Sequence, residues 1–230
     1  MKSVGISEII EDMAGHFGLK LVKGTEGMTF SRVVETEAYY LDRKGKVTDR
    51  QLAPIRDSKA NDFALGLMGS FVSALGFNLD EIIGGAEGEV KGHTLQLCSI
   101  SEGGEGNKVT KLLIVLRFPR SLDYVLNIYP EHSLHRIGKF LFRLQDIQMG
   151  HPELDKKVMV KAKRVSSAKN LLSYDRAHQA LLDLYDGSFE YAVVNDASAR
   201  VIINRRVNPS EYDTILEKLL NVSKALGLCQ

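Results

Sequence analysis

The segment Leu144–Val165, with the sequence LQDIQMGHPELDKKVMVKAKRV, decides the expected fold. It bends at Gly150-His151-Pro152, because glycine is free to take a positive φ and proline holds φ near about −65°. A strand follows, with apolar groups on one side and basic groups on the solvent side. The apolar positions are Val158, Val160, Ala162 and Val165, and the basic ones are Lys157, Lys161, Lys163 and Arg164.

The bend is expected to set the register of this strand. A slip of one residue would turn the valines outward and the lysines inward, at a high cost in desolvation. Asp155 is well placed to fix the turn, because a short carboxylate can accept hydrogen bonds from nearby backbone amides. Asp146 can act in the same way on the other side of the bend. We therefore expect both carboxylates to be structural.

The rest of the chain alternates between short strands and amphipathic helices. The run Val109–Leu116 is almost continuously apolar, which predicts a central strand buried on both faces. Helices are expected over 7–17, from Ser166 or Ser167 to Tyr185, and over 209–226. Strands are expected over 28–41, 94–100, 109–118, 122–129, 189–194 and 200–204, with glycines at 84–92 marking bends or bulges. These patterns predict an α+β fold, with a mainly antiparallel sheet and helices packed on one face.

The domain organisation is open between two arrangements. One has an N-terminal helical and strand region over 1–79 and an α+β core domain over 80–230; the other is one continuous domain over 1–230. Residues 63–79 contain no charged side chain. This segment is shorter than a typical transmembrane helix and carries several glycines and serines. We expect a buried helix in the core or self-association through 63–79, with peripheral membrane contact as the alternative.

The composition excludes several classes of function. The chain has 230 residues with 30 basic and 29 acidic side chains, so no global field attracts nucleic acid. The basic run from Lys156 to Lys169 fits either a lysine-protected edge strand or a surface for an acidic partner. Residues 1–20 interrupt their apolar positions with acidic side chains, which argues against a signal peptide. Two widely separated cysteines give no disulfide framework, and together these features predict a cytoplasmic protein.

The string VVETEAY at Val33–Tyr39 resembles the water-activating strand of alkyladenine-type DNA glycosylases. The resemblance implies that Glu35 or Glu37 would activate water against the glycosidic bond of a flipped base. The sequence that follows, YLDRKGKVTDRQLAP, lacks the histidine loop, the Arg-Asn pair and the aromatic segment of that family. We therefore interpret the resemblance as coincidental and Glu35 and Glu37 as solvated strand residues.

Histidines and acids gather between positions 131 and 155. His132, His135, His151 and Asp155 are the candidate metal ligands, but their spacing matches no zinc motif. Phosphate-binding loops of the Walker A type and the nucleophile motif G-x-S-x-G are also missing from the sequence. We expect no metal and no cofactor.

The pattern Gln145-Asp146-Ile147, then Gly150-His151-Pro152-Glu153-Leu154-Asp155, resembles a family of uncharacterised prokaryotic domains. In that family such a turn leads into a strand, a helix with a Leu-Leu pair, here Leu171-Leu172, and a hairpin. The resemblance covers about residues 80–205 and implies a prokaryotic α+β domain, without implying an activity. We expect a non-catalytic binding or interaction protein. The alternative is a hydrolase, either metal-assisted at the 131–155 cluster or glycosylase-like at Glu35 and Glu37.

Overall fold

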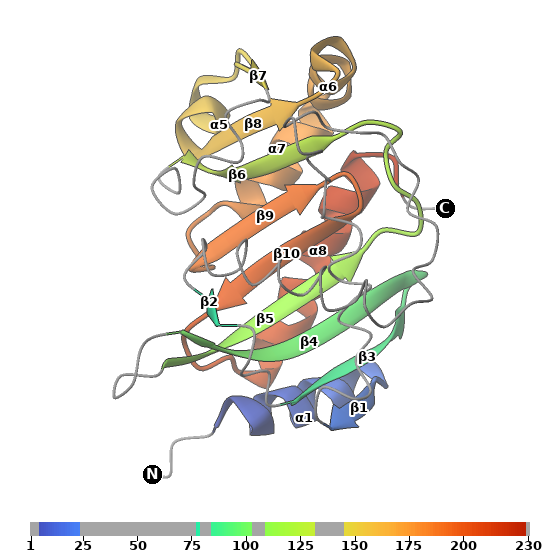
Figure 1. The fold of residues 1–230 in the computed structure, drawn as a ribbon, viewed down its shortest axis with the longest axis vertical. Coiled ribbons are helices and arrows are strands. Elements are labelled where there is room, and N and C mark those ends of the chain that lie inside the picture. Colours follow the sequence, from blue (N-terminus) through green and yellow to red (C-terminus); the bar gives the residue numbers. More distant parts are fainter. Residues whose placement is uncertain (1–4, 24–76, 79–83, 103–108, 132–144, 229–230) are drawn as a thin grey trace, which may run out of the picture.

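The computed structural model describes residues 5–23, 77–78, 84–102, 109–131 and 145–228 (Figure 1). Its helices are α1 (Ile6–Phe17), α5 (Pro152–Lys157), α6 (Val165–Leu172), α7 (Asp175–Leu184) and α8 (Tyr212–Ala225), and the 3₁₀ turn η4 (Pro209–Glu211) precedes α8. Its strands are β1 (Lys20–Lys23), β2 (Phe77–Asn78), β3 (Gly84–Val90), β4 (His93–Glu102), β5 (Val109–Arg117), β6 (Leu126–Pro130), β7 (Gln145–Asp146), β8 (Val158–Ala162), β9 (Tyr191–Asn195) and β10 (Ser198–Ile203).

These ten strands form one sheet in the order β1-β3-β4-β5-β10-β9-β6-β8-β7, and β2 pairs with β4. Every pairing among the described strands is antiparallel. Residues on either side of position 80 share this sheet, because β1 pairs with β3. The predicted α+β fold with a mainly antiparallel sheet is confirmed.

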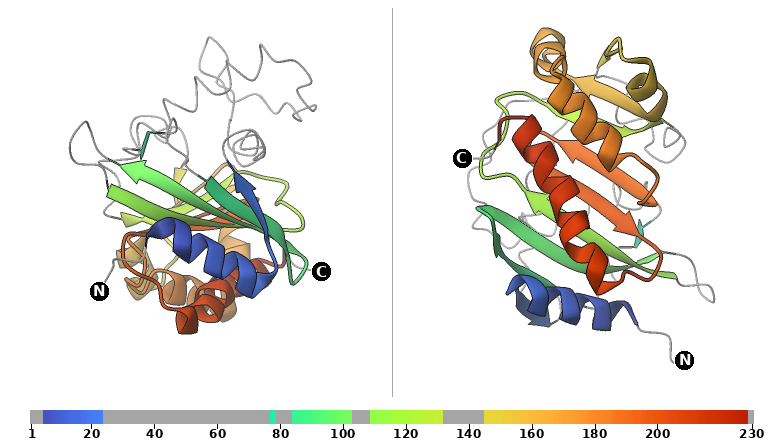
Figure 2. Two further views of the ribbon diagram at one scale, coloured as in Figure 1. Left: turned by 90° about the horizontal axis from the view of Figure 1, so that it is seen from below. Right: turned by 180° about the vertical axis from the view of Figure 1, so that it is seen from behind.

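Helices α1, α7 and α8 lie on one face of the sheet (Figure 2). Alternate residues of the central strands point to them, including Leu95 and Leu97 of β4 and Leu112, Ile114 and Leu116 of β5. These side chains are at most 1% exposed and pack in one cluster with Leu216, Leu219 and Leu220 of α8. The core of the protein therefore lies between the sheet and this helical layer.

The opposite face of the sheet is buried as well. Lys111 and Val115 of β5 alternate with the residues that face the helices, and they are 5% and 1% exposed. On β4, Gln96 lies directly across from Val115 and Cys98 lies across from Leu113, and both are also buried. Burial on both faces explains the nearly unbroken apolar run of β5 and confirms its prediction as a central strand.

The segment 144–165 differs in part from its prediction. The strand is present as β8, but Pro152–Lys157 forms the short helix α5 before it. Pro152 stands at the start of this helix and basic residues stand at its end, which are the usual signals of a helix. Lys161 is only 7% exposed, so its predicted position on the solvent side is wrong. The reason is that both faces of β8 are buried.

The helix predicted from Ser166 or Ser167 to Tyr185 is two helices, α6 and α7, with a break between them. Ser173 donates a hydrogen bond from its hydroxyl to the carbonyl of Asn170, 2.8 Å away. Tyr174 then takes an extended conformation with φ −80° and ψ 135°. Serine competes for backbone carbonyls in this way, which favours the end of a helix over its continuation.

The strands expected over 94–100 and 109–118 pair in one antiparallel hairpin, and those expected over 189–194 and 200–204 pair in a second. The pair β4–β5 encloses 103–108, and the pair β9–β10 turns at Asp196 and Ala197. The side-chain oxygen of Asn195 accepts hydrogen bonds from the backbone amides of Ala197 (2.9 Å) and Ser198 (2.7 Å), which fixes the second turn. Among the expected glycine bends, Gly92 has φ 76° in the turn between β3 and β4.

Two further expectations need correction. The strand expected over 122–129 begins only at Leu126 and includes Pro130. Phe77 and Asn78, at the end of the expected helix 63–79, form the strand β2. The remainder of that helix and the strand expected over 28–41 lie outside the described residues.

Candidate functional site

The turn before α5 uses Asp155 as its acceptor, as the sequence predicts. The Asp155 carboxylate accepts hydrogen bonds from the backbone amides of Met149 (2.8 Å) and Gly150 (3.0 Å). Gly150 has φ 76°, a conformation that glycine adopts without strain. His151 is the residue before α5, and its Nδ1 accepts a long hydrogen bond of 3.4 Å from the Leu154 amide. Asp155 and His151 thus hold the chain at the start of α5.

Replacing Asp155 with alanine is expected to lower the free energy of unfolding by about 1–2 kcal/mol, because two backbone amides lose their acceptor. Asp155→Asn should lose less, since its amide oxygen can still accept one of these bonds. Urea denaturation of the purified variants measures both. Glu153→Ala, on the exposed side of the same helix, is the matched control. Wild-type stability in Asp155→Ala would contradict the structural role.

His151 approaches a second histidine that the sequence did not associate with it. The ring centroids of His151 and His178 of α7 lie 4.7 Å apart, and the buried Nε2 of His178 has no hydrogen-bond partner among the residues that the structure describes. Within the described residues, no group of three or more histidine, cysteine, aspartate or glutamate side chains is arranged to hold a metal ion. The other candidates, His132 and His135, lie outside the described residues. Glu35 and Glu37 lie outside them too.

A serine–histidine pair links β4 to α8. Nε2 of His93 lies 2.7 Å from Oγ of Ser223, and Nδ1 of His93 lies 2.9 Å from the carbonyl oxygen of Lys91. The carbonyl can only accept, so Nδ1 donates to it, and in the neutral imidazole Nε2 then accepts a hydrogen bond from the serine hydroxyl. His93 is 3% exposed and Ser223 is fully buried. A substrate cannot reach this serine without opening the core, so the pair joins the helix to the sheet.

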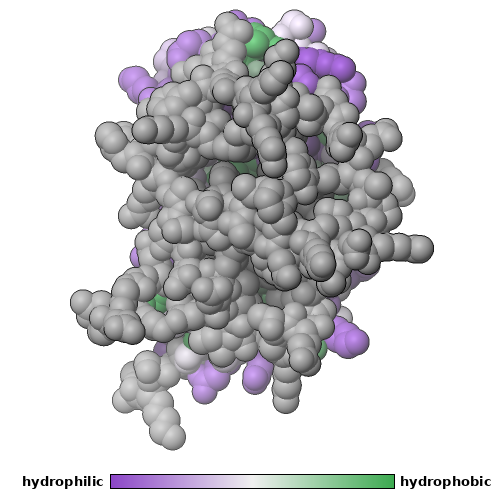
Figure 3. All heavy atoms as spheres, viewed as in Figure 1, coloured by the Kyte–Doolittle hydropathy of each residue, from purple (hydrophilic) through white to green (hydrophobic). Residues whose placement is uncertain are grey.

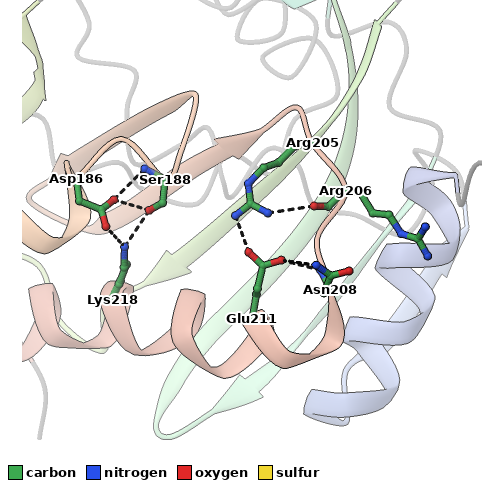
Figure 4. Close-up of polar contacts among 7 residues, drawn as sticks. All are labelled: Asp186, Ser188, Arg205, Arg206, Asn208, Glu211 and Lys218. Carbon is green, nitrogen blue, oxygen red and sulfur yellow. Dashed lines mark hydrogen bonds and ion pairs between the residues drawn. The ribbon is translucent and has the colours of Figure 1, made fainter.

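A second serine lies near the surface, in the loop between α7 and β9 (Figure 4). Oγ of Ser188 donates to Asp186 (2.5 Å), and Nζ of Lys218 on α8 donates to Ser188 (2.9 Å) and to Asp186 (2.5 Å). A serine–lysine pair needs a neutral lysine to act as a base. Here Asp186 engages both groups, since its carboxylate accepts hydrogen bonds from Nζ of Lys218 and from Oγ of Ser188. The trio is therefore suited to holding the loop against α8.

The electrostatics of Asp186 agree with this role. Partial burial acts to raise the pKa of its carboxyl, but hydrogen bonds from Lys218 and Ser188 outweigh burial and hold that pKa below its ordinary value. A carboxyl whose pKa is lower in the folded protein contributes stability above its unfolded pKa, about 3.9, and that contribution disappears as the pH falls through the folded pKa.

Wild-type protein is therefore expected to lose more stability than Asp186→Asn when the pH is lowered below about 4. Urea denaturation at neutral pH and at several values between about pH 4 and pH 2 checks this difference. Glu217→Gln, at an exposed position of α8, controls for the removal of a carboxylate from the same helical layer. Equal acid sensitivity of wild type and Asp186→Asn would show that the contact with Lys218 is not formed.

One end of α8 is fixed by a related contact, also drawn in Figure 4. Glu211 accepts a hydrogen bond from the guanidinium of Arg205 (2.7 Å) and another from the backbone amide of Asn208 (2.9 Å). The bonds from Arg205 and Asn208 lower the pKa of Glu211. Asn208 and Glu211 form a capping box around Pro209, which agrees with the predicted start of the last helix. These residues begin the helix.

Within the described residues, no helix covers the face of the sheet opposite α1, α7 and α8. On this helix-free face, polar side chains join neighbouring strands. Gln96 of β4 donates to Glu87 of β3 (2.5 Å) and accepts from Nε of Arg117 of β5 (3.3 Å). On β10, Arg200 donates to Ser198 (3.4 Å). Burial lowers the pKa of Arg200 to about 10. Charged side chains are therefore buried on this face, and burying a charge costs free energy unless an opposite charge or hydrogen bonds compensate it.

The same face carries an apolar cluster and the buried cysteine. Tyr129 and Met159 are buried against Tyr191 and Val193, and the Tyr129 hydroxyl lies 3.1 Å from the Met159 sulfur. Burial, assisted by the nearby charge of Glu87, raises the pKa of the Cys98 thiol to about 12. A thiol with so high a pKa is a poor nucleophile at neutral pH.

The basic run from Lys156 to Lys169 lies near the end of the sheet where β8 is located, and it continues into α6. Lys161 is buried, whereas Lys157, Lys163, Arg164 and Lys169 are exposed. Arg164 pairs with Asp123 at 2.7 Å, and both side chains are more than half exposed, so the pair adds little stability. Figure 3 shows hydrophilic side chains at this end of the molecule.

Two of these contacts were missed in the sequence. The Asp186-Gly187-Ser188 string is a turn signature that could have placed the loop, since Gly187 has φ 93°. The contact of this loop with Lys218, and the contact of His93 with Ser223, join residues far apart in sequence. No spacing pattern in the sequence predicts such contacts.

Within the described residues, no helix is both long and apolar enough to cross a membrane. No protein-family model matches the chain, and no curated protein matches it in sequence. Among solved structures, the chain is similar to the mycobacterial trehalose monomycolate transport factor A, TtfA, with a TM-score of 0.57 and 12% sequence identity. The match covers 99% of this chain and 98% of that one. At this identity the similarity shows a shared fold and nothing further.

Proposed function

We propose that this protein is a non-catalytic binding or interaction protein of prokaryotic, cytoplasmic type. One observation carries the proposal: at three described polar sites, the serine, histidine and aspartate side chains that could do chemistry are engaged in holding the fold. Asp155 and His151 hold the start of α5, and Ser188 holds a loop to α8. Ser223 is fully buried beside His93.

The structural neighbour supports the same class of function. It is named as a transport factor, and a factor of that kind can act by binding a partner or a cargo without converting it. We take only this class from the similarity. We also propose that the partner is a protein or a small ligand rather than nucleic acid, because the chain has a net charge of only +1. Self-association through residues 63–79 is part of the same proposal.

The proposal is tested by comparing activity with stability in three variants, Ser188→Ala, Ser223→Ala and Asp155→Asn. We expect no turnover of p-nitrophenyl esters or p-nitrophenyl phosphate by wild type or variants, while each variant melts at a lower temperature. Turnover by wild type that Ser188→Ala abolishes, at an unchanged melting temperature, would identify a hydrolase. Elemental analysis and size-exclusion chromatography with light scattering complete the test, since bound stoichiometric metal would favour the enzyme and a dimer would support self-association.

A further inference from the structure

We draw no further inference here: the strongest candidate, the helix-free face of the sheet with Lys111 and Arg117 of β5 and Arg200 of β10, carries none because nothing in the described residues shows what covers it.

Discussion

Replacing Val115 with lysine is expected to lower the free energy of unfolding by roughly 3–5 kcal/mol, which is a large part of the stability of an ordinary domain. Val115 is 1% exposed on the helix-free face of β5. It lies directly across from Arg200 on β10, and Arg117 is two residues further along its own strand. A lysine at this position would add a buried cation between two arginines. Urea denaturation followed by circular dichroism measures the loss.

Two further variants separate burial from charge. Val115→Asp should lose less stability than Val115→Lys, because its carboxylate would face the guanidinium of Arg200. Val109→Lys, at the exposed first residue of the same strand, should stay within about 0.5 kcal/mol of wild type. If Val115→Lys were as stable as Val109→Lys, the helix-free face would be open to water.

Ser223→Ala is expected to lower the free energy of unfolding by about 1–3 kcal/mol. The variant leaves Nε2 of His93 buried without its donor, since the two groups lie 2.7 Å apart and are almost fully buried. Leaving one partner of a buried hydrogen bond unsatisfied costs more than the bond itself contributes. Chemical denaturation of the purified variant measures the loss, and Ser210→Ala, at an exposed position, is the control.

The double variant His93→Leu/Ser223→Ala tests whether the loss comes from this pair. It removes both polar groups and leaves no orphan acceptor, so its loss should be smaller than the sum of the losses in the two single variants. Additive losses would mean that His93 and Ser223 contribute independently, and the contact seen between β4 and α8 would then have no energetic role.

Features that depend on neighbouring residues could be predicted from the sequence. The apolar run of β5 indicated burial on both faces, and Val115 and Ile114, which point to opposite faces, are each 1% exposed. Asp155 was expected to accept hydrogen bonds from backbone amides at its turn, because a short carboxylate reaches only nearby groups. It accepts them from the amides of Met149 and Gly150. The hairpin β9–β10 followed from the polar turn between two β-rich runs.

Features that depend on distant residues could not be predicted. Lys161 looked solvent-facing because its neighbours alternate, yet the burial of β8 is set by the rest of the sheet. The break between α6 and α7 coincides with a hydrogen bond from the Ser173 hydroxyl to the Asn170 carbonyl, and helical periodicity on either side masked the break. No sequence pattern links His93 to Ser223, because the two residues are 130 positions apart in the chain. The candidate residues Glu35, Glu37, His132 and His135 lie outside the described residues, so their roles stay predictions.

The pairing of β5 with β10 has a consequence for the newly made chain. Strand β10 (198–203) pairs with the edge of β5 that faces away from β4, and it is synthesised long after residues 109–117. Until residues 198–203 leave the ribosome, β5 has paired with β4 only and presents an apolar edge with unsatisfied backbone groups, which is a site for aggregation. Pairing on both edges of β5 is therefore expected to be complete only after residues 198–203 have been synthesised.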